Sequence, residues 1–109
     1  MRPRRALLFM PGDDRHKIEK GAALGVDAVI MDLEDGVARS HKAAARETVT
    51  AALREVDFGA TERLVRINPV GSVFHQDDLD ATIEGQPDGY VLPKVDSPEM
   101  VRVVAEWLT

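Results

Sequence analysis

The sequence predicts an α/β fold, because short apolar runs alternate with segments that carry helix signals along the whole chain. Four apolar runs, at residues 5–10, 27–33, 63–68 and 89–94, have the length and composition of buried strands. Each run is followed by turn residues and then by helical spacing or a capping signal. Strands that alternate with helices are joined by crossovers, so we expect a parallel sheet.

The first two helices are indicated by apolar spacing. After "PGDD", Ile18, Ala22 and Gly25 mark one face of a short helix with acidic residues at its start. The next helix is expected to begin near Ser40, whose hydroxyl can cap it. Its buried face is marked by four residues at i, i+3, i+4 and i+7: Val49, Ala52, Leu53 and Val56.

Two further helices are expected after the third and fourth strands. Leu79 and Ile83 stand at i and i+4, which indicates a helix after "PVG". In "DSPEMVRVVAEWL", Ser97 at the N-cap and Pro98 at the first helical position are strong start signals. The sequence therefore predicts a fourth helix that begins at residues 97–98.

Composition restricts the class of protein. A chain of 109 residues with 44% hydrophobic and 30% charged residues can form one small domain. A net charge of -5 and an aromatic content of 5% argue against nucleic-acid binding. Absence of cysteine excludes disulfides and thiolate metal sites. Its apolar stretches are too short for a signal peptide or a membrane span, so we expect a soluble, cytoplasmic protein.

The stretch "MDLEDGV" places three carboxylates, those of Asp32, Glu34 and Asp35, directly after a predicted buried strand. Strand alternation puts Asp32 and Glu34 on one face and Asp35 at the lip of the strand end. Chemistry in parallel α/β sheets gathers at the carboxyl ends of the strands. Repulsion between these acids must be offset, so the cluster is either a solvated turn or a functional site.

Arg66 stands at the equivalent position of the next predicted strand and is the expected counter-charge. It is either a structural partner of Asp32 or Glu34, or a planar fork that grips a substrate carboxylate or carbonyl oxygen. Asn68 is expected to shape the following loop, and Lys94 is a second donor at the end of the fourth strand. The histidines lack ligand spacing and are interpreted as surface or loop residues: His16, His41 and His75.

Several of these motifs occur together in one known family. "RALLFMPGDDRHKIEKGAALGVDAVIMDLEDGVA", "KAAAR", "RLVRINPVG" and "GYVLPKVDSPE" resemble, in order, the N-terminal part of the citrate lyase beta subunit-like acyl-CoA lyases of the HpcH/HpaI aldolase superfamily. The resemblance implies a (β/α)8 TIM barrel, of which residues 1–109 supply the first four β/α units. This chain would then be the N-terminal half of a lyase domain.

The resemblance also implies an activity: a carbon–carbon bond is cleaved or formed between an acyl-CoA thioester and a 2-oxo acid such as oxaloacetate, glyoxylate or pyruvate. Catalytic roles fall on Glu34, Asp35 and Arg66. Substrate contacts fall on Arg66, Asn68, Lys94 and Asp32. Arg15 and Lys17, in the loop after the first strand, are either the residues that hold a phosphate or the pantetheine arm of CoA, or part of a solvated helix start.

Mg2+ is the cofactor that the resemblance implies, and the family's ligands, a Glu and an Asp, lie in strands that follow the fourth. No residue of this chain is therefore assigned as a metal ligand, and the chain alone is expected to be inactive. Family members are homo-oligomers, commonly trimers, so self-association is expected. An unclosed half-barrel would also leave the strands at 5–10 and 89–94 as open edges.

Two alternatives remain. The first is a noncatalytic half-barrel that serves as an interaction module. The second is a receiver-like phosphoacceptor domain, favoured by Asp13, Asp14 and Lys94 but weakened because "RLVRINP" offers no aspartate.

Overall fold

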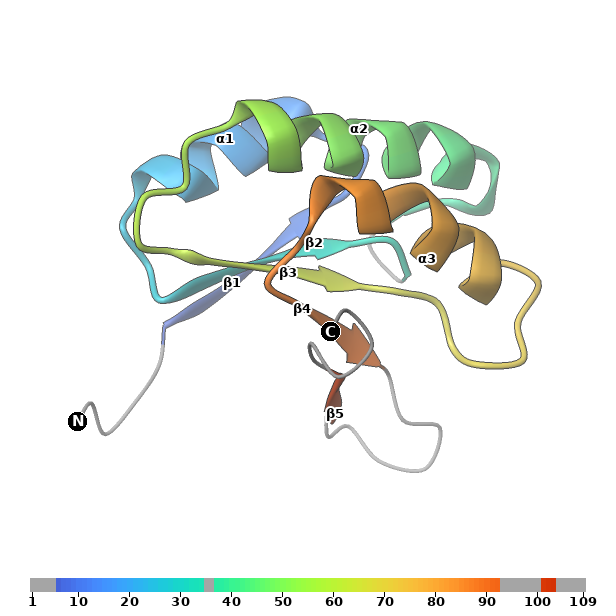
Figure 1. Cartoon of the computed structure of the whole chain (residues 1–109). Helices are drawn as coiled ribbons and strands as arrows, with labels where there is room; N and C mark the ends of the chain where they lie inside the picture. Colours follow the sequence, from blue (N-terminus) through green and yellow to red (C-terminus); the bar gives the residue numbers. More distant parts are fainter. Residues whose placement is uncertain (1–5, 35–36, 93–100, 104–109) are drawn as a thin grey trace.

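The computed structural model describes residues 6–34, 37–92 and 101–103, which form one sheet with helices on one of its faces (Figure 1). Its elements, in chain order, are β1 (Leu7–Pro11), α1 (Arg15–Ala23), β2 (Ala28–Asp32), η1 (Arg39–His41), α2 (Lys42–Glu55), β3 (Glu62–Arg66), α3 (His75–Thr82), η2 (Ile83–Gly85), β4 (Gly89–Leu92) and β5 (Val101–Val103). The predicted α/β class and the predicted order of the first seven strands and helices are confirmed.

The sheet has the strand order β1-β2-β3-β4-β5, and β1 to β4 are parallel. Each parallel strand therefore lies beside the next one in the sequence, and α1, α2 and α3 return over the same face of the sheet (Figure 1). Because the strands are parallel, the ends of β1, β2 and β3 meet at one edge, where Pro11, Asp32 and Arg66 stand in register.

The starts of two helices differ in detail from the predictions. Asp14 is the N-cap of α1, and its Oδ1 accepts a hydrogen bond from the Lys17 amide at 3.0 Å. The acidic residues therefore precede this helix instead of occupying its first turn. The prediction that Ser40 caps the second helix is wrong, because Ser40 lies inside η1 and α2 begins at Lys42 without a side-chain cap.

The prediction of a fourth helix is wrong where the structure describes that segment. Residues 101–103 form β5, which pairs antiparallel with β4, while Ser97 and Pro98 lie outside the described residues. Valine is β-branched and suits a strand, and backbone groups at the outer edge of β4 gain partners from the pairing. The prediction that the strand at 89–94 forms an open edge is wrong for the same reason.

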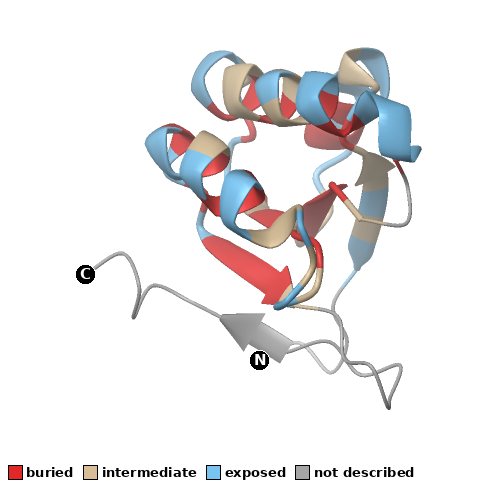
Figure 2. Cartoon of the chain, turned by 90° about the vertical axis from the view of Figure 1, so that its right-hand side faces the viewer, coloured by how far each residue is buried: buried red, intermediate tan, exposed pale blue. Residues whose placement is uncertain are grey.

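Two apolar clusters occupy the two faces of the sheet. The larger one lies between the sheet and the helices, where buried segments of both face one another (Figure 2). It includes Met31, Val65 and Val49. A smaller cluster on the opposite face consists of Ala28, Ile30, Leu64 and Val91. Side chains alternate along each strand, so Asp32 and Arg66 continue the smaller cluster toward the carboxyl ends. The acidic cluster therefore lies on the face that no described helix covers.

Tyr90 connects β4 to α3 within the larger cluster. Its side chain is fully buried, and its hydroxyl is hydrogen-bonded to the Thr82 Oγ1 at 2.9 Å. Burial raises the pKa of Tyr90 above its ordinary value, although the hydrogen bond with Thr82 opposes that shift. The contact joins the C-terminal end of α3 to β4.

Gly12 permits the close approach of the first loop to the end of β2. Its amide donates to the Asp32 carbonyl at 2.8 Å, and a Cβ placed on Gly12 would lie 2.7 Å from that same oxygen. Any larger residue must push the loop away from Asp32.

Gly12→Ala is therefore expected to lower the free energy of unfolding by about 1–3 kcal/mol, because the new methyl group meets backbone that cannot yield. Gly21→Ala is the matched control: it lies within α1, its added Cβ meets the side chains of Met10 at 3.5 Å and Leu8 at 3.6 Å, which is ordinary van der Waals contact, and it should be neutral or stabilising. Urea denaturation of both variants measures the difference. Equal stabilities would contradict the proposed backbone contact.

Candidate functional site

Asp32, Glu34 and Arg66 meet at the carboxyl ends of β2 and β3. Arg66 Nε donates to Asp32 Oδ1 at 3.0 Å, and Arg66 Nη2 donates to Asp32 Oδ2 at 2.6 Å. Arg66 Nε also lies 3.6 Å from Glu34 Oε1, within ion-pair distance. Relative exposures of the three side chains are 6% for Asp32, 18% for Glu34 and 17% for Arg66. One guanidinium thus offsets part of the negative charge of two adjacent carboxylates.

The backbone produces this arrangement directly. Asp32 and Arg66 are partners in the parallel register of β2 and β3. The Glu34 amide donates to Asp32 Oδ1 at 2.8 Å, which turns the chain just after the strand. The Arg66 guanidinium also lies 5.1 Å from the ring of Phe9 on β1, a cation–π distance. Residues of β1, of β2 and of the turn after β2 therefore hold the guanidinium of β3 in place.

The structural interpretation of Arg66, as a partner of Asp32 and Glu34, is confirmed. Its substrate-binding role stays a prediction. Asp35 and Lys94 lie outside the described residues.

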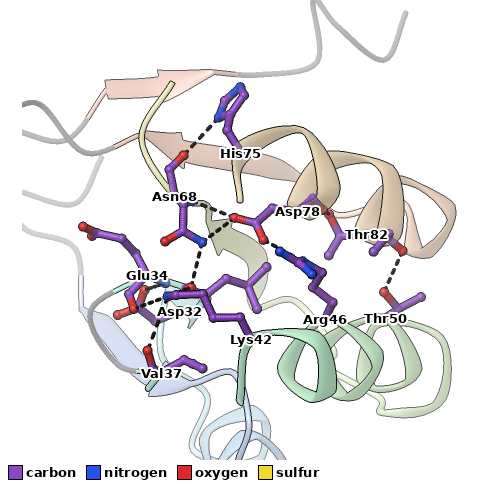
Figure 3. Close-up of polar contacts among 12 residues, drawn as sticks. Asp32, Glu34, Val37, Lys42, Arg46, Thr50, Asn68, His75, Asp78 and Thr82 are labelled. Atoms are coloured by element: carbon purple, nitrogen blue, oxygen red, sulfur yellow. Dashed lines mark hydrogen bonds and ion pairs between the residues drawn. The ribbon is translucent and has the colours of Figure 1, made fainter. Parts of the chain in front are cut away.

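Asn68 is buried beside the site in a polar network below the strand ends (Figure 3). Its Nδ2 donates to the Leu33 carbonyl at 3.0 Å and to Asp78 Oδ2 at 2.6 Å. Its backbone amide donates to the same Asp78 oxygen at 2.8 Å. Both amide hydrogens of the side chain are thus used within the fold, which bears out the expected loop-shaping role. The predicted substrate contact stays a prediction.

Asp78 and Arg46 complete this network between α3 and α2. Arg46 Nε donates to Asp78 Oδ1 at 2.9 Å, and the Asp78 side chain is fully buried. Asp78 therefore accepts hydrogen bonds at both of its oxygens, as a buried carboxylate requires. His75 Nδ1 lies 3.0 Å from the Asn68 carbonyl, so this histidine has a contact in the loop.

Lys42, at the start of α2, contacts the loop that carries Glu34. Its Nζ donates to three carbonyls, those of Leu33, Glu34 and Val37. Sequence reasoning assigned no role to Lys42, Arg46 or Asp78. One signal was available for Lys42: it lies on the same helical stripe as Ala45 and Val49, where an apolar residue is expected.

Arg15 and Lys17 lie on α1, beside the first loop. Arg15 Nε is bonded to Glu19 at 2.8 Å, and its Nη1 is bonded to Glu55 at 2.9 Å. The hydrogen bond with Glu55 is the largest cause that raises the pKa of Arg15 above its ordinary value. Lys17 is exposed. A phosphate would have to compete with two carboxylates for Arg15, and the predicted CoA contact stays a prediction.

Among the described residues, no group of three or more His, Cys, Asp or Glu side chains could hold a metal ion. The two described carboxylates of the acidic cluster are engaged by Arg66. Within residues 6–34, 37–92 and 101–103, no helix has the length and apolar character required to cross a membrane.

Fold and site together define an α/β protein with a carboxylate–arginine cluster at the carboxyl ends of parallel strands. Residues 5–109 match the family described as HpcH/HpaI aldolase/citrate lyase, and the chain belongs to that family.

Curated relatives from three kinds of organism match nearly the whole chain. Human mitochondrial citramalyl-CoA lyase is 42% identical over 106 residues, which cover 95% of this chain and 31% of that protein. Citrate lyase subunit beta of Leuconostoc mesenteroides subsp. cremoris is 34% identical, with coverages of 99% and 36%. A (3S)-malyl-CoA thioesterase of Cereibacter sphaeroides is 36% identical, with coverages of 95% and 36%. The chain spans about a third of the length of these relatives.

Solved structures show the same fold. The citrate lyase beta subunit from Mycobacterium tuberculosis, complexed with oxaloacetate and magnesium, superposes with a TM-score of 0.69 at 38% identity, covering 84% of this chain and 39% of that one. The CitE protein of the same organism, in complex with magnesium, acetoacetate and coenzyme A, gives 0.70 at 38% identity, covering 85% and 33%.

Asp78→Asn tests the buried network. Removing one charge leaves Arg46 without its ion-pair partner in a buried place, so the free energy of unfolding should fall by about 3–5 kcal/mol. Asp80→Asn is the matched control: Asp80 lies on the same helix, is exposed and bonds to Gln76, so a loss within about 0.5 kcal/mol is expected. Urea denaturation measures both, and similar losses would show that the network does not stabilise the fold.

Proposed function

We propose that this chain forms one side of the active site of an acyl-CoA lyase that cleaves or forms a carbon–carbon bond between an acyl-CoA and a 2-oxo acid. The observation that carries the proposal is the guanidinium of Arg66, held by Asp32 and Glu34 at the carboxyl ends of the strands. Family membership and relatives named as citramalyl-CoA lyase and citrate lyase subunit beta support it.

We also propose that the sheet is the first part of a (β/α)8 barrel. Strands β1 to β4 follow one another in sequence order, and the three described α-helices cover one face. A barrel segment has this arrangement, whereas a doubly wound sheet has helices on both faces and a switch in strand order. The consecutive order also disfavours the receiver-like alternative. The face with Ala28, Ile30, Leu64 and Val91 would then line the barrel interior.

In this proposal Arg66 binds the carboxylate or carbonyl oxygen of the 2-oxo acid. Its two-pronged pairing with Asp32 fixes the plane of the guanidinium before substrate arrives, so little conformational entropy is lost on binding. Glu34, partly exposed on the same face, is placed to move a proton, and Asp35 shares that proposed role. Asp32 holds Arg66 and the Glu34 backbone in place. A contact of Asp32 with the substrate is also proposed.

Mg2+ is part of the proposal because two similar structures contain magnesium with an oxo acid, one of them also with coenzyme A. A bound Mg2+ supplies Lewis-acid stabilisation of a developing enolate. Its ligands are proposed to lie outside the described residues. Asn68 and Lys94 as substrate contacts, Arg15 and Lys17 as CoA contacts, and a cytoplasmic location also remain proposals. The 109-residue chain alone is then expected to be inactive.

A second function is favoured by one relative, the (3S)-malyl-CoA thioesterase. Hydrolysis of the thioester would release free CoA thiol, whereas carbon–carbon cleavage leaves the thioester intact. Detection of the free thiol therefore separates the two reactions. A noncatalytic interaction module would show neither.

The role of Arg66 is tested in a chimera in which residues 5–92 replace the aligned segment of human citramalyl-CoA lyase. The chimera should cleave an acyl-CoA substrate only with Mg2+ or Mn2+, and Arg66→Ala should remove roughly 3 kcal/mol or more of transition-state stabilisation. Arg54→Ala is the matched control, because Arg54 is an exposed arginine on α2 paired with Glu84. Steady-state kcat/KM measures both.

Full activity of the Arg66→Ala chimera would exclude Arg66 from the mechanism. An inactive chimera that is correctly folded would contradict the proposed lyase function itself.

Self-association is proposed through the edge of the sheet at β1. Within the described residues β1 pairs only with β2, and it exposes Leu7 at 46% and Phe9 at 40%. Such an edge favours pairing with another chain. Light scattering on the 109-residue chain should give a mass above that of the monomer, and Leu7→Lys should reduce it. Val73→Lys, at an equally apolar but more exposed loop position, should not. A compact monomer of the unmodified chain would contradict this proposal.

A further inference from the structure

We propose that Lys42 is a positioning residue that holds the loop after β2 in the conformation needed by Glu34. The inference deepens the proposed function and rests on it, since that function gives Glu34 and Arg66 their roles. Lys42 belongs to α2, and its side chain does not enter the site. It acts on the site by binding the backbone of the loop that carries Glu34.

The geometry of Lys42 is that of a buried ammonium with a full set of acceptors. Its Nζ lies 2.8 Å from the Leu33 carbonyl, 2.9 Å from the Glu34 carbonyl and 3.3 Å from the Val37 carbonyl. The residue is 8% exposed. An ammonium has three N–H donors and no acceptor, so three carbonyls match its capacity. Figure 3 shows Lys42 extending from the start of α2 to this loop.

The three carbonyls span the loop from end to end. Leu33 and Glu34 precede positions 35 and 36 in the chain, and Val37 follows them. Two backbone bonds are made by described residues of the loop: the Leu33 amide donates to the Arg66 carbonyl at 2.8 Å, and the Val37 amide donates to the Glu34 carbonyl at 3.3 Å. Lys42 therefore brings both ends of the loop to one point and limits the movement of Glu34.

Two further contacts extend this effect to the loop after β3. The Leu33 carbonyl also accepts a hydrogen bond from Asn68 Nδ2 at 3.0 Å. The ring of Phe74 lies 5.3 Å from Lys42 Nζ and 5.2 Å from the Arg39 guanidinium, both cation–π distances. Lys42 thus contacts both the loop that follows β2 and, through Phe74, the loop that follows β3.

A direct chemical role fits Lys42 less well than positioning. Each N–H of its ammonium is directed to a backbone carbonyl, and a donor used in this way is not aimed at a substrate. Loss of the ammonium would leave carbonyls with fewer donors in a buried place, which the loop can relieve only by opening to water. We expect the consequence at Glu34, whose backbone carbonyl is one of the three.

Amide hydrogen exchange on the 109-residue chain tests the contact directly. Lys42→Met keeps the apolar stem and removes the charge, and exchange at the Glu34 and Val37 amides should rise by about tenfold or more. The Asp88 amide, which donates to the Arg63 carbonyl at the opposite end of the sheet, should not change. Lys20→Met, at an exposed lysine of α1, is the matched control and should alter neither. Unchanged exchange at Glu34 and Val37 would overturn the proposal.

The cysteine-free sequence permits a rescue that separates the charge from general packing. Lys42→Cys can be alkylated in the unfolded state with 2-bromoethylamine: the cysteine thiolate attacks the carbon that carries bromine, bromide leaves, and the product is a lysine side chain in which sulfur replaces the γ-methylene. Refolded alkylated protein should regain the exchange protection that Lys42→Cys loses. Failure of the rescue in a folded product would contradict the assignment.

A measurement on the unmodified chain guards against variants that do not fold. The NH3+ protons of Lys42 should give a slowly exchanging nitrogen-correlated NMR signal, because all three are hydrogen-bonded and buried, whereas Lys20 should give none. A Lys42 signal lost to rapid exchange would contradict the geometry without reference to any substitution.

The chimera described above links the contact to catalysis. Lys42→Met should lower kcat by about tenfold or more and leave KM within about threefold, because substrate contacts persist while Glu34 loses its fixed position. A fall in stability with unchanged kcat would show a structural role only and would overturn the positioning assignment. If the unsubstituted chimera is inactive, the proposed function fails, while the exchange and NMR results still decide whether Lys42 holds the loop.

Discussion

The ion pair between Arg66 and Asp32 is the interaction on which the organisation of this chain depends. Carboxylates clustered after a buried strand would repel one another, and the parallel register of β2 and β3 places a guanidinium directly beside those of Asp32 and Glu34. That register in turn requires the apolar alternation of both strands, because a slip of one residue would turn Arg66 toward the helices. The same contact is thus a condition of the fold and the centre of the proposed site.

Strands and their order could be predicted because their signals are local. The apolar runs, the turns "PGDD" and "PVG" and the helical spacing each lie within a few residues, and the pairing of Asp32 with Arg66 followed from equivalent positions on neighbouring strands. The prediction of a helix at residues 101–103 was wrong because it used a local capping signal at Ser97 and Pro98. The pairing of this segment with the edge of β4 is a property of the assembled sheet, which a local signal does not report.

The buried polar network could not be predicted for a related reason. Asn68 and Leu33 are 35 residues apart, and Arg46 and Asp78 are 32 residues apart. The local sequence around each of these residues does not predict which distant residue it contacts. Only Lys42 gave a signal in the sequence, because it is a charged residue on an apolar helical stripe. Its contacts could not be predicted, because they depend on the path of the loop after β2, which has no sequence periodicity.

Leu33 shows why site geometry and stability are not separable in this chain. Its side chain is buried in the cluster between sheet and helices, its amide donates to the Arg66 carbonyl, and its carbonyl accepts from Lys42 and Asn68. One residue thereby joins the apolar core, the strand that carries Arg66 and both polar contacts beneath the loop. A shift in core packing at Leu33 would move its carbonyl, and with it the backbone of Glu34. Because Glu34 follows directly in the chain, the position of its carboxylate relative to Arg66 depends on packing on the other face of the sheet.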